Sequence, residues 1–360
     1  MGHIENPHNL RVVMLVQKVD ESDWLVGFTV GWIRALAARV KSLDVVALEA
    51  RAASLPANVR VHSLGKERGV GRVRELLAFE RHLATLSRNA DVIFGHLTPR
   101  YTWLAAPWAI IHRVPQCMWY THRQIDLELR IAARCSRWIA TAVPGSFPLS
   151  GPKVHVLGHG IDSERFAPGD PPPDSDPPLI VAVGRLAPIK RHNVLIEAAG
   201  ILRDRGVKAN VAIAGGATSI EGVTYQRQLE TQIAALNLVD RVKLVGVQRG
   251  DDLVRLYHRA SIATNLSPVG LFDKAALESM CCACPTLVTN PAFTDLLADN
   301  RDLLYLPDPP DPHILADKLA TLLNLSIPER SAIGQSLHER TVQAHGLERL
   351  MDRLVTLWTT

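Results

Sequence analysis

Two cations follow a short apolar run in the second half of the chain. Leu179–Val183 is an unbroken apolar stretch of strand length, a turn begins at Gly184, and Arg185 and Lys190 lie within that turn. The periodicity of the next segment predicts a helix, so both cations stand at the carboxyl end of a buried strand, beside the amides of a helix start. Amides and cations in that place favour a phosphate group. Similar turns also occur in α/β proteins that bind no phosphate, so the motif alone leaves both interpretations open.

Two histidines stand at the ends of predicted strands in the first half. His96 follows the strand 91–95, and His122 follows the strand 116–120. A residue at the carboxyl end of a parallel strand faces the crevice where ligands bind, and imidazole exchanges protons near neutral pH. A lone histidine is more often a packing or solvent residue. Gly27, in the first predicted loop, either lets the backbone approach a ligand or is an ordinary loop glycine.

Clusters of cysteine and aspartate invite a metal interpretation that the spacing does not favour. Cys281, Cys282 and Cys284 lie on a predicted helix, where neighbouring positions point in different directions, and no nearby CxxC or HxxxH completes a tetrahedral set. Asp174 and Asp176 form a DxD pair inside a proline-rich stretch that is typical of a linker. Free cysteine packs as a small hydrophobe. We therefore expect no metal site and no cofactor.

Length and composition limit the architecture and the class of partner. A chain of 360 residues is too long for one ordinary core, so two α/β domains are expected. The net charge of +4 is too small to indicate nucleic acid, and it is compatible with an anionic small ligand or an acidic membrane. Five cysteines, an odd number, argue against a disulfide framework. The start is polar and no run of eighteen apolar residues occurs, so we expect a cytoplasmic protein.

Apolar strands alternate with helical patterns through the first half, which predicts a parallel sheet. The predicted strands are 10–17, 44–48, 59–64, 91–95, 116–120, 138–143 and 153–157, with 18–31 as a loop and helices at 32–41 and 67–88. The helix 67–88 is amphipathic and rich in arginine. A solvated outer face and a contact with anionic lipid both fit this pattern.

The same alternation returns after a proline- and acid-rich stretch, 168–178, which cannot continue a strand or a helix. The predicted strands are 179–183, 210–214, 242–245, 261–265, 286–289 and 303–306, and the predicted helices are 193–205, 225–236, 253–259, 274–282, 315–325 and 345–358. We therefore expect a first domain at 1–166, a linker at 167–178, a second domain at 179–340 and a closing helix within 341–360.

The order of several short motifs resembles the family 4 retaining glycosyltransferases, also called glycosyl transferases group 1. The sequence VGRL is followed by Lys190, by AGG at 214–216, by VG at 245–246 and by an LESM helix that ends in CACP. These motifs have the order and spacing of that family. The resemblance implies two facing Rossmann-like α/β domains with parallel sheets (GT-B type), and a last helix that crosses back to the first domain.

The resemblance also implies roles for matching residues. Arg185 and Lys190 would hold the diphosphate of a nucleotide-sugar donor, because fixed cations stabilise the leaving group without a metal ion. Glu278 would bind the ribose hydroxyls, and His122, in a Tyr-Thr-His setting, would contact the transferred sugar. The other expected donor-binding positions are Gly184, Gly215, Gly216, Gly246, Val247, Phe272, Asp273 and Lys274. On the acceptor side, Gly27 and His96 are the candidates.

One loop departs from the family's pattern. The family usually has a glutamate eight positions before the one at Glu278, where this chain has Gly270. That glutamate normally contacts hydroxyls of the donor sugar, so its absence puts the identity of the sugar in doubt. Asp273 and Lys274 either reach the same pocket or are a helix N-terminal acid and an exposed lysine.

The implied function is a retaining, metal-independent glycosyltransferase that moves a sugar from a nucleotide-diphosphate sugar to an acceptor hydroxyl of a glycan, glycolipid or small molecule. Two alternatives remain. A sugar-nucleotide epimerase can share this architecture, and a non-catalytic nucleotide-sugar-binding protein would explain the glycine at Gly270. We expect no nucleic acid partner, and a peripheral contact with the anionic inner face of a membrane is compatible with the basic helix.

Overall fold

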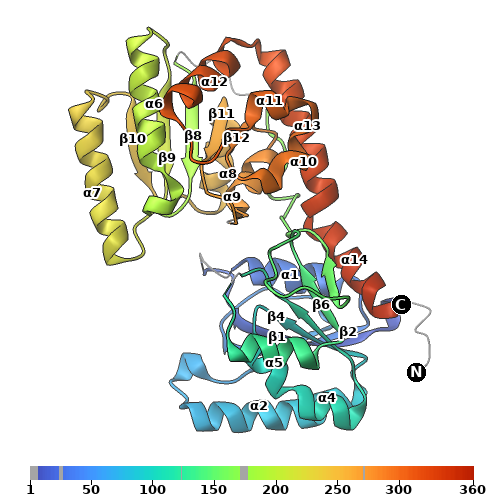
Figure 1. Cartoon of the computed structure of the whole chain (residues 1–360). Coiled ribbons are helices and arrows are strands. Elements are labelled where there is room, and N and C mark those ends of the chain that lie inside the picture. Colours follow the sequence, from blue (N-terminus) through green and yellow to red (C-terminus); the bar gives the residue numbers. More distant parts are fainter. Residues whose placement is uncertain (1–6, 24–26, 123, 171–176, 271) are drawn as a thin grey trace. The chain divides into compact units, whose positions relative to one another are not determined.

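The computed structural model describes residues 7–23, 27–122, 124–170, 177–270 and 272–360 (Figure 1). The chain divides into two compact units: unit 1 comprises residues 1–162 and 345–360, and unit 2 comprises residues 163–344. Each unit contains a parallel sheet with helices packed on it. This confirms the predicted α/β class with two Rossmann-like units.

Unit 1 is built on a sheet that has seven strands among the described residues, in the order β3-β2-β1-β4-β5-β6-β7. Every neighbouring pair is parallel. The bounds are β1 Arg11–Val19, β2 Ser42–Ala50, β3 Val59–Ser63, β4 Val92–His96, β5 Gln116–Trp119, β6 Trp138–Thr141 and β7 Val154–Val156. Alternate residues of β1 enter different apolar clusters, Met14 in one and Leu15 in the other, because successive strand side chains point to opposite faces. The unbroken apolar pattern of the strand therefore reports burial on both sides.

The helices of unit 1 were only partly predicted. They are α1 Phe28–Ala37, α2 Arg72–Leu86, α3 Pro99–Leu104, α4 Ala106–His112, α5 Leu127–Cys135 and α14 Leu347–Thr359. The expected loop 18–31 is wrong at its end, because α1 already begins at Phe28. The helices α3, α4 and α5 were not predicted at all. The first two span six and seven residues, too short for a helical periodicity to stand out.

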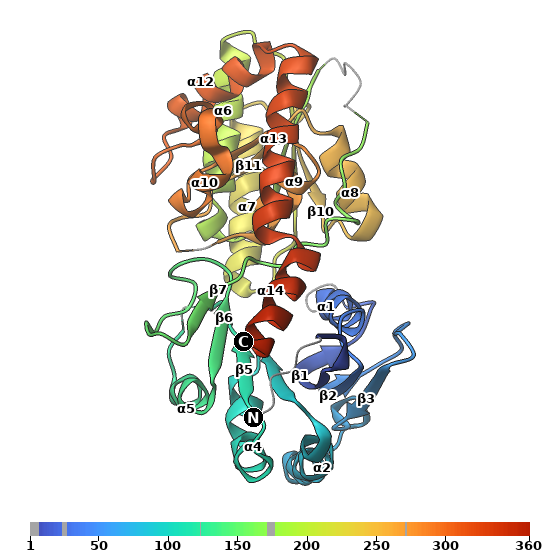
Figure 2. The ribbon, with the colours of Figure 1, turned by 90° about the vertical axis from the view of Figure 1, so that its right-hand side faces the viewer.

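The last helix, α14, packs into the core of unit 1, as the resemblance implied. Leu350, Met351 and Leu354 are fully buried in the same cluster as residues of strand β1 and helix α1. Helix α14 lies beside α1 (Figure 2). The chain passes the boundary between the units twice, and the two passages run side by side. A parallel bridge joins Ile161 to Gly346, and the Leu347 amide donates to the Ile161 carbonyl at 2.8 Å.

Unit 2 contains, among the described residues, a five-stranded parallel sheet in the order β10-β9-β8-β11-β12 (Figure 1). The bounds are β8 Leu179–Val183, β9 Asn210–Ala214, β10 Val242–Gly246, β11 Ile262–Asn265 and β12 Thr286–Val288. The predicted strand 303–306 is wrong. Arg301–Leu304 forms the short helix α11, and only a single bridge joins Tyr305 to Val288. The apolar run correctly indicated buried residues. These residues are buried because they pack beside β12, and they do not form a hydrogen-bonded strand of the sheet.

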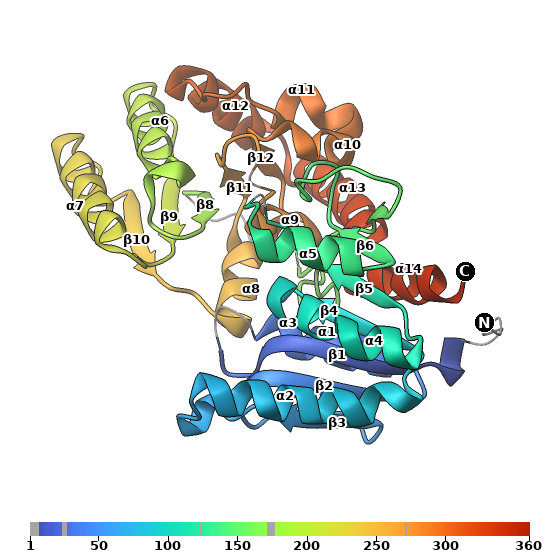
Figure 3. The same ribbon diagram turned by 60° about the horizontal axis from the view of Figure 1, so that its bottom comes forward.

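The helices of unit 2 cover both faces of that sheet (Figure 3). They are α6 His192–Asp204, α7 Ile220–Ala235, α8 Gly250–Arg259, α9 Lys274–Cys281, α10 Thr294–Leu297, α11 Arg301–Leu304, α12 Pro312–Asn324 and α13 Ile327–His345. Helix α13 was not predicted, because it is largely polar and its apolar residues form only a weak stripe. Among the described residues, no helix is long and apolar enough to cross a membrane.

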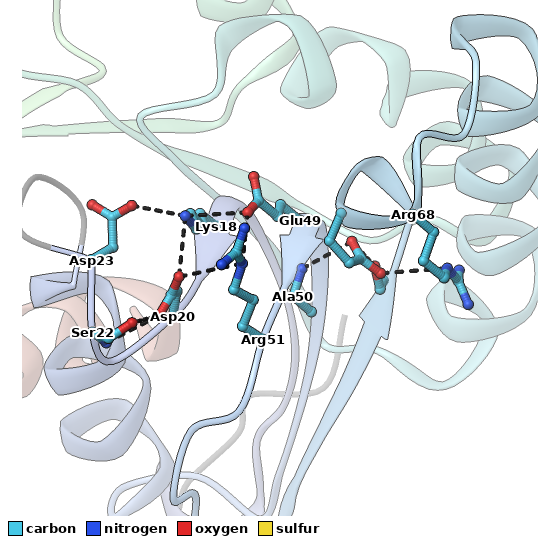
Figure 4. A network of polar contacts seen from close by, with 10 residues as sticks. Lys18, Asp20, Ser22, Asp23, Glu49, Ala50, Arg51 and Arg68 are labelled. Carbon is cyan, nitrogen blue, oxygen red and sulfur yellow. Dashed lines mark hydrogen bonds and ion pairs between the residues drawn. The ribbon is translucent and has the colours of Figure 1, made fainter.

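A charged cluster ties the loop after β1 to the end of β2 (Figure 4). The Lys18 ammonium lies 3.1 Å from Asp20, 2.8 Å from Asp23 and 3.1 Å from Glu49. Lys18 and Glu49 are register partners on the two parallel strands. Arg51 closes the cluster, with its guanidinium 3.7 Å from Asp20 and 3.2 Å from Glu49. The cluster fixes the carboxyl ends of both strands in unit 1.

Candidate functional site

The carboxyl ends of the parallel strands of unit 2 share one edge of the sheet, and glycines line it. The Gly184 amide donates to the Ala214 carbonyl at 2.9 Å, and the Gly215 amide donates to the Gly246 carbonyl at 2.9 Å. These bonds join the turns after β8, β9 and β10. A Cβ atom at Gly215 would lie 1.8 Å from the Gly184 carbonyl oxygen. Only glycine therefore allows the two turns to approach each other this closely.

Gly216 and Val247 extend this edge. The Leu186 amide donates to the Gly216 carbonyl at 3.0 Å, which anchors the turn that carries the two cations. A Cβ atom at Gly216 would lie 2.8 Å from the Val247 side chain. Val247 itself is exposed. The predicted donor-binding glycines thus gather with Val247 along the ends of three adjacent strands.

The two cations of the turn have different environments. Lys190 ends the short 3₁₀ helix Pro188–Lys190 and is only 9% exposed. Its ammonium forms an ion pair with Asp273 and donates to the Ser267 hydroxyl at 3.3 Å. Arg185 is exposed, and within the described residues its guanidinium has no ion-pair partner. The turn therefore presents one compensated cation and one uncompensated cation.

Asp273 organises the loop that leads into α9. Its Oδ2 accepts hydrogen bonds from the Asn265 amide at 2.8 Å and the Ser267 hydroxyl at 3.0 Å, in addition to the Lys190 ammonium. Its Oδ1 caps the helix by accepting from the Ala275 amide at 3.4 Å. Burial alone would raise the pKa of this carboxyl, but the Lys190 charge and the hydrogen bonds outweigh it and lower the pKa. Asp273 is consequently ionised.

Glu278 lies one turn further along α9 and is 9% exposed. Burial raises the pKa of its carboxyl, while the Lys274 ammonium, 3.5 Å from its Oε1, opposes that shift. The spacing of four residues places both side chains on one face of the helix. Phe272, just before the helix, stacks on Phe293 with ring centroids 4.3 Å apart. Four of the predicted donor-binding residues thus lie on α9 or in the two positions before it.

Sequence reasoning did not identify three polar residues of this site. Asn265 is the last residue of β11 and Ser267 comes two positions later, so their place at a strand end was a usable signal. His192, the first residue of α6, is 3% exposed, and its Nε2 has no hydrogen-bond partner among the described residues. His192 lines a small cavity together with Lys190 and Ser267. Burial lowers its pKa to about 4, so the ring is neutral at physiological pH.

The candidates of unit 1 have contrasting environments. His122 is exposed after β5, with its ring edge-to-face against Tyr120. His96 ends β4 and is 2% exposed, with its ring 4.4 Å from that of Trp32, and burial lowers its pKa to about 3. Gly27 precedes α1, and a Cβ there would lie 2.3 Å from the Asp23 carbonyl oxygen. The roles assigned to these three residues remain predictions.

The candidate metal ligands have ordinary structural environments. Cys281, Cys282 and Cys284 are buried, and burial raises the pKa of the Cys284 thiol to about 12. In the part of the chain that the structure describes, no group of three or more histidine, cysteine, aspartate or glutamate side chains is placed to share a metal ion. Asp174 and Asp176 lie outside the described residues.

Comparisons with known proteins identify relatives of this chain. A D-inositol 3-phosphate glycosyltransferase from Salinispora tropica is 31% identical over 220 residues, which cover 56% of this chain and 44% of that protein. The chain spans less than half the length of the curated relatives that it matches.

Two solved structures share the fold over nearly the whole chain. Sucrose-phosphate synthase from Thermosynechococcus elongatus has a TM-score of 0.73 at 17% identity and covers 97% of this chain and 98% of that one. HepE from Anabaena, in complex with UDP-glucose, has a TM-score of 0.68 at 15% identity, covering 96% and 98%. Residues 163–340, which contain the carboxyl-edge site, match the family of glycosyl transferases group 1. This match places residues 163–340 in the glycosyl transferases group 1 family.

Proposed function

We propose that this protein is a retaining glycosyltransferase that moves a sugar from a nucleotide-diphosphate sugar to an acceptor hydroxyl without a metal ion. One observation carries the proposal. The residues expected to hold such a donor, spread over 184–278 in the sequence, meet at one edge of the sheet inside the family-matched region. HepE, which shares the fold, is described in complex with UDP-glucose.

The proposed reaction uses the charges of that edge. The bond between the anomeric carbon and the diphosphate oxygen breaks, and the acceptor oxygen bonds to the same face of that carbon. The proton of the acceptor hydroxyl passes to the departing phosphate oxygen. Arg185 and Lys190 stabilise the negative charge that grows on the diphosphate, and the two oxygens of Glu278 accept hydrogen bonds from the ribose diol.

A thermal-shift screen with uridine, guanosine and adenosine diphosphate sugars tests the donor site, because a ligand of the folded state raises its apparent stability. The donor that binds is then incubated with candidate acceptors, and release of nucleoside diphosphate is measured with and without EDTA. We expect acceptor-dependent release that EDTA leaves intact. Release that EDTA abolishes would contradict the metal-independent mechanism.

Two other functions predict different products. A sugar-nucleotide epimerase would convert the donor without any acceptor, and a binding protein would release nothing. The loop before α9 supports the binding-protein alternative. Gly270 has a φ of +92°, a conformation that a glutamate side chain disfavours, so the family's usual first glutamate cannot simply occupy this backbone. Product analysis with and without acceptor separates the three functions.

We also propose that unit 1 contacts anionic membrane through the outer surface of α2 and α4. The Trp108 indole donates to Glu80 at 2.6 Å and joins the two helices. Large apolar side chains on these helices are exposed, namely Val73 at 73%, Leu77 at 64%, Ile110 at 77% and Ile111 at 63%. Arginines are exposed on the same helix α2, namely Arg72, Arg74 and Arg81. Apolar side chains beside cations fit a lipid surface of negative charge.

Flotation with vesicles tests this contact. The protein should float with phosphatidylserine-containing vesicles and not with pure phosphatidylcholine. The double variant Leu77→Asp, Ile111→Asp should lose flotation. The variant Ile220→Asp changes another exposed residue, in unit 2, and should float like the wild type. Equal flotation of all variants would contradict the proposed surface, and a dimer in solution would assign it to a second copy instead.

A further inference from the structure

Lys190, one of the two cations proposed to hold the diphosphate, already has a counter-ion. Its ammonium is paired with Asp273, and the side chains are only 9% and 13% exposed. Solvent screens such a pair less than it screens a surface pair, so the two charges largely cancel for an approaching anion. Arg185 has no such partner among the described residues. Of the two cations, Lys190 is thus both paired with a carboxylate and shielded from solvent, whereas Arg185 is exposed.

A diphosphate that binds Lys190 meets the carboxylate of Asp273 at the same place. Either the diphosphate replaces Asp273 as the partner of Lys190, or it binds beside a like charge, which is unfavourable. Both cases lower the affinity for the anion. The size of the effect depends on whether Asp273 can release Lys190 without becoming an unpaired buried charge.

The surroundings of Asp273 allow that release. Its Oδ2 also accepts from the Asn265 amide and the Ser267 hydroxyl, and its Oδ1 accepts from the Ala275 amide. These donors remain when Lys190 turns away, so the carboxylate keeps hydrogen bonds that stabilise its charge. A simple buried ion pair would instead leave an uncompensated carboxylate. Lys190 keeps the Ser267 hydroxyl within reach.

We propose that Asp273 is an internal competitor of the diphosphate for Lys190. In the ligand-free protein the carboxylate holds the lysine, the donor takes the lysine over, and the carboxylate recovers it when the nucleoside diphosphate leaves. Asp273 therefore weakens binding of the product and speeds its release. This inference rests on the proposed function, because it concerns the same phosphate subsite.

The variant Asp273→Asn tests the competition. Asparagine keeps the size and one carbonyl oxygen for the helix cap, and it removes the charge. Its NH2 group replaces the second oxygen and donates, for example to the Ser267 hydroxyl, instead of accepting. We expect pyrophosphate and UDP, measured by titration calorimetry, to bind the variant at least threefold more tightly than the wild type. Dissociation of UDP should slow by a similar factor. The probe pyrophosphate makes the result independent of the base that the natural donor carries.

Two further variants complete the experiment. Asp317→Asn removes one negative charge from an exposed pair with Arg205 and should leave pyrophosphate affinity unchanged. Asp273→Ser also removes the carboxylate and keeps a helix-capping oxygen, so it replaces Asp273→Asn if that variant does not fold.

The outcomes separate this inference from the proposed function. Tighter binding by both Asp273 variants and not by Asp317→Asn supports the competition. Equal or weaker binding by the Asp273 variants, with a wild type that binds pyrophosphate, overturns the competition and leaves the donor site standing. A wild type that binds neither pyrophosphate nor any nucleoside diphosphate overturns both.

Discussion

At the scale of single residues, carboxylates in both units lie beside cations that come from a neighbouring strand or turn. Asp273 meets a lysine 83 positions earlier in the sequence, and Glu49 meets Lys18 across the β1–β2 pair. Each pairing depends on the parallel register of strands rather than on local spacing. Such charged contacts make stability depend on pH.

Asp20 should stabilise unit 1 at neutral pH and not in acid. The Ser22 hydroxyl and the Lys18 ammonium hold the pKa of Asp20 below its ordinary value of 3.8, against the opposing effect of burial. A depressed pKa contributes stability above the unfolded value, and that stability is lost as the pH falls through the folded pKa. We expect Asp20→Asn to lower the urea midpoint at pH 7, and the difference to shrink below about pH 3.

The control is Asp352→Asn, which changes an exposed carboxylate paired with Arg39 and should alter the midpoint little. A difference between Asp20→Asn and the wild type that stays constant down to the most acidic pH would contradict the role of the charge.

At the scale of elements, the turn between β8 and α6 positions the donor site through an unusual backbone. Arg191 has a φ of +55°, in the left-handed region, just before helix α6. Its guanidinium is paired with Asp308, which also accepts from the Val269 amide at 3.3 Å. The pair therefore links this turn to the loop that precedes α9.

Replacing Arg191 with alanine should destabilise unit 2 more than replacing it with glycine. Both changes remove the pair with Asp308, but only glycine adopts a positive φ without strain, which amounts to about 1 kcal/mol. Thermal unfolding followed by calorimetry should give a higher midpoint for Arg191→Gly than for Arg191→Ala. Equal midpoints, or a more stable alanine variant, would show that the left-handed backbone is not kept in solution.

At the scale of the whole molecule, unit 1 is assembled from two distant parts of the chain. Residues 345–360 follow unit 2 in the sequence and still complete the core of unit 1. The core of unit 1 is therefore finished only when the last residues are present.

Removing residues 346–360 should unfold unit 1 selectively. Leu350, Met351 and Leu354 are fully buried and Trp358 is 5% exposed. Each such side chain contributes roughly 1.5–3 kcal/mol, so their joint loss is comparable to the stability of about 5–15 kcal/mol of a whole domain. Limited proteolysis should leave a fragment of unit 2 and digest unit 1.

Removing only Thr359 and Thr360 is the matched control, because neither residue belongs to the buried core. Its digestion pattern should equal that of the full chain. Persistence of an intact unit 1 in the longer deletion would contradict the completing role of α14.

The sequence by itself indicated the seven and five strands described in the two sheets, most of the longer helices and the resemblance to the family. Buried strands and turns leave local signals in the sequence. An apolar run of strand length, such as that of β8, indicates a buried strand, and the glycine that follows it indicates a turn, so both can be predicted without the fold. Lys190 and Glu278 were predicted to bind the donor from the order of the motifs, which is also a property of the sequence alone.

Only the tertiary structure decided which polar groups meet. The contact of Lys190 with Asp273 and the deep burial of His96 both depend on residues far apart in the sequence. The run 303–306 shows the same limit, because its apolar residues are buried without joining the ladder. Periodicity reports whether a side chain is buried, but which partners it meets is set by strand order and packing.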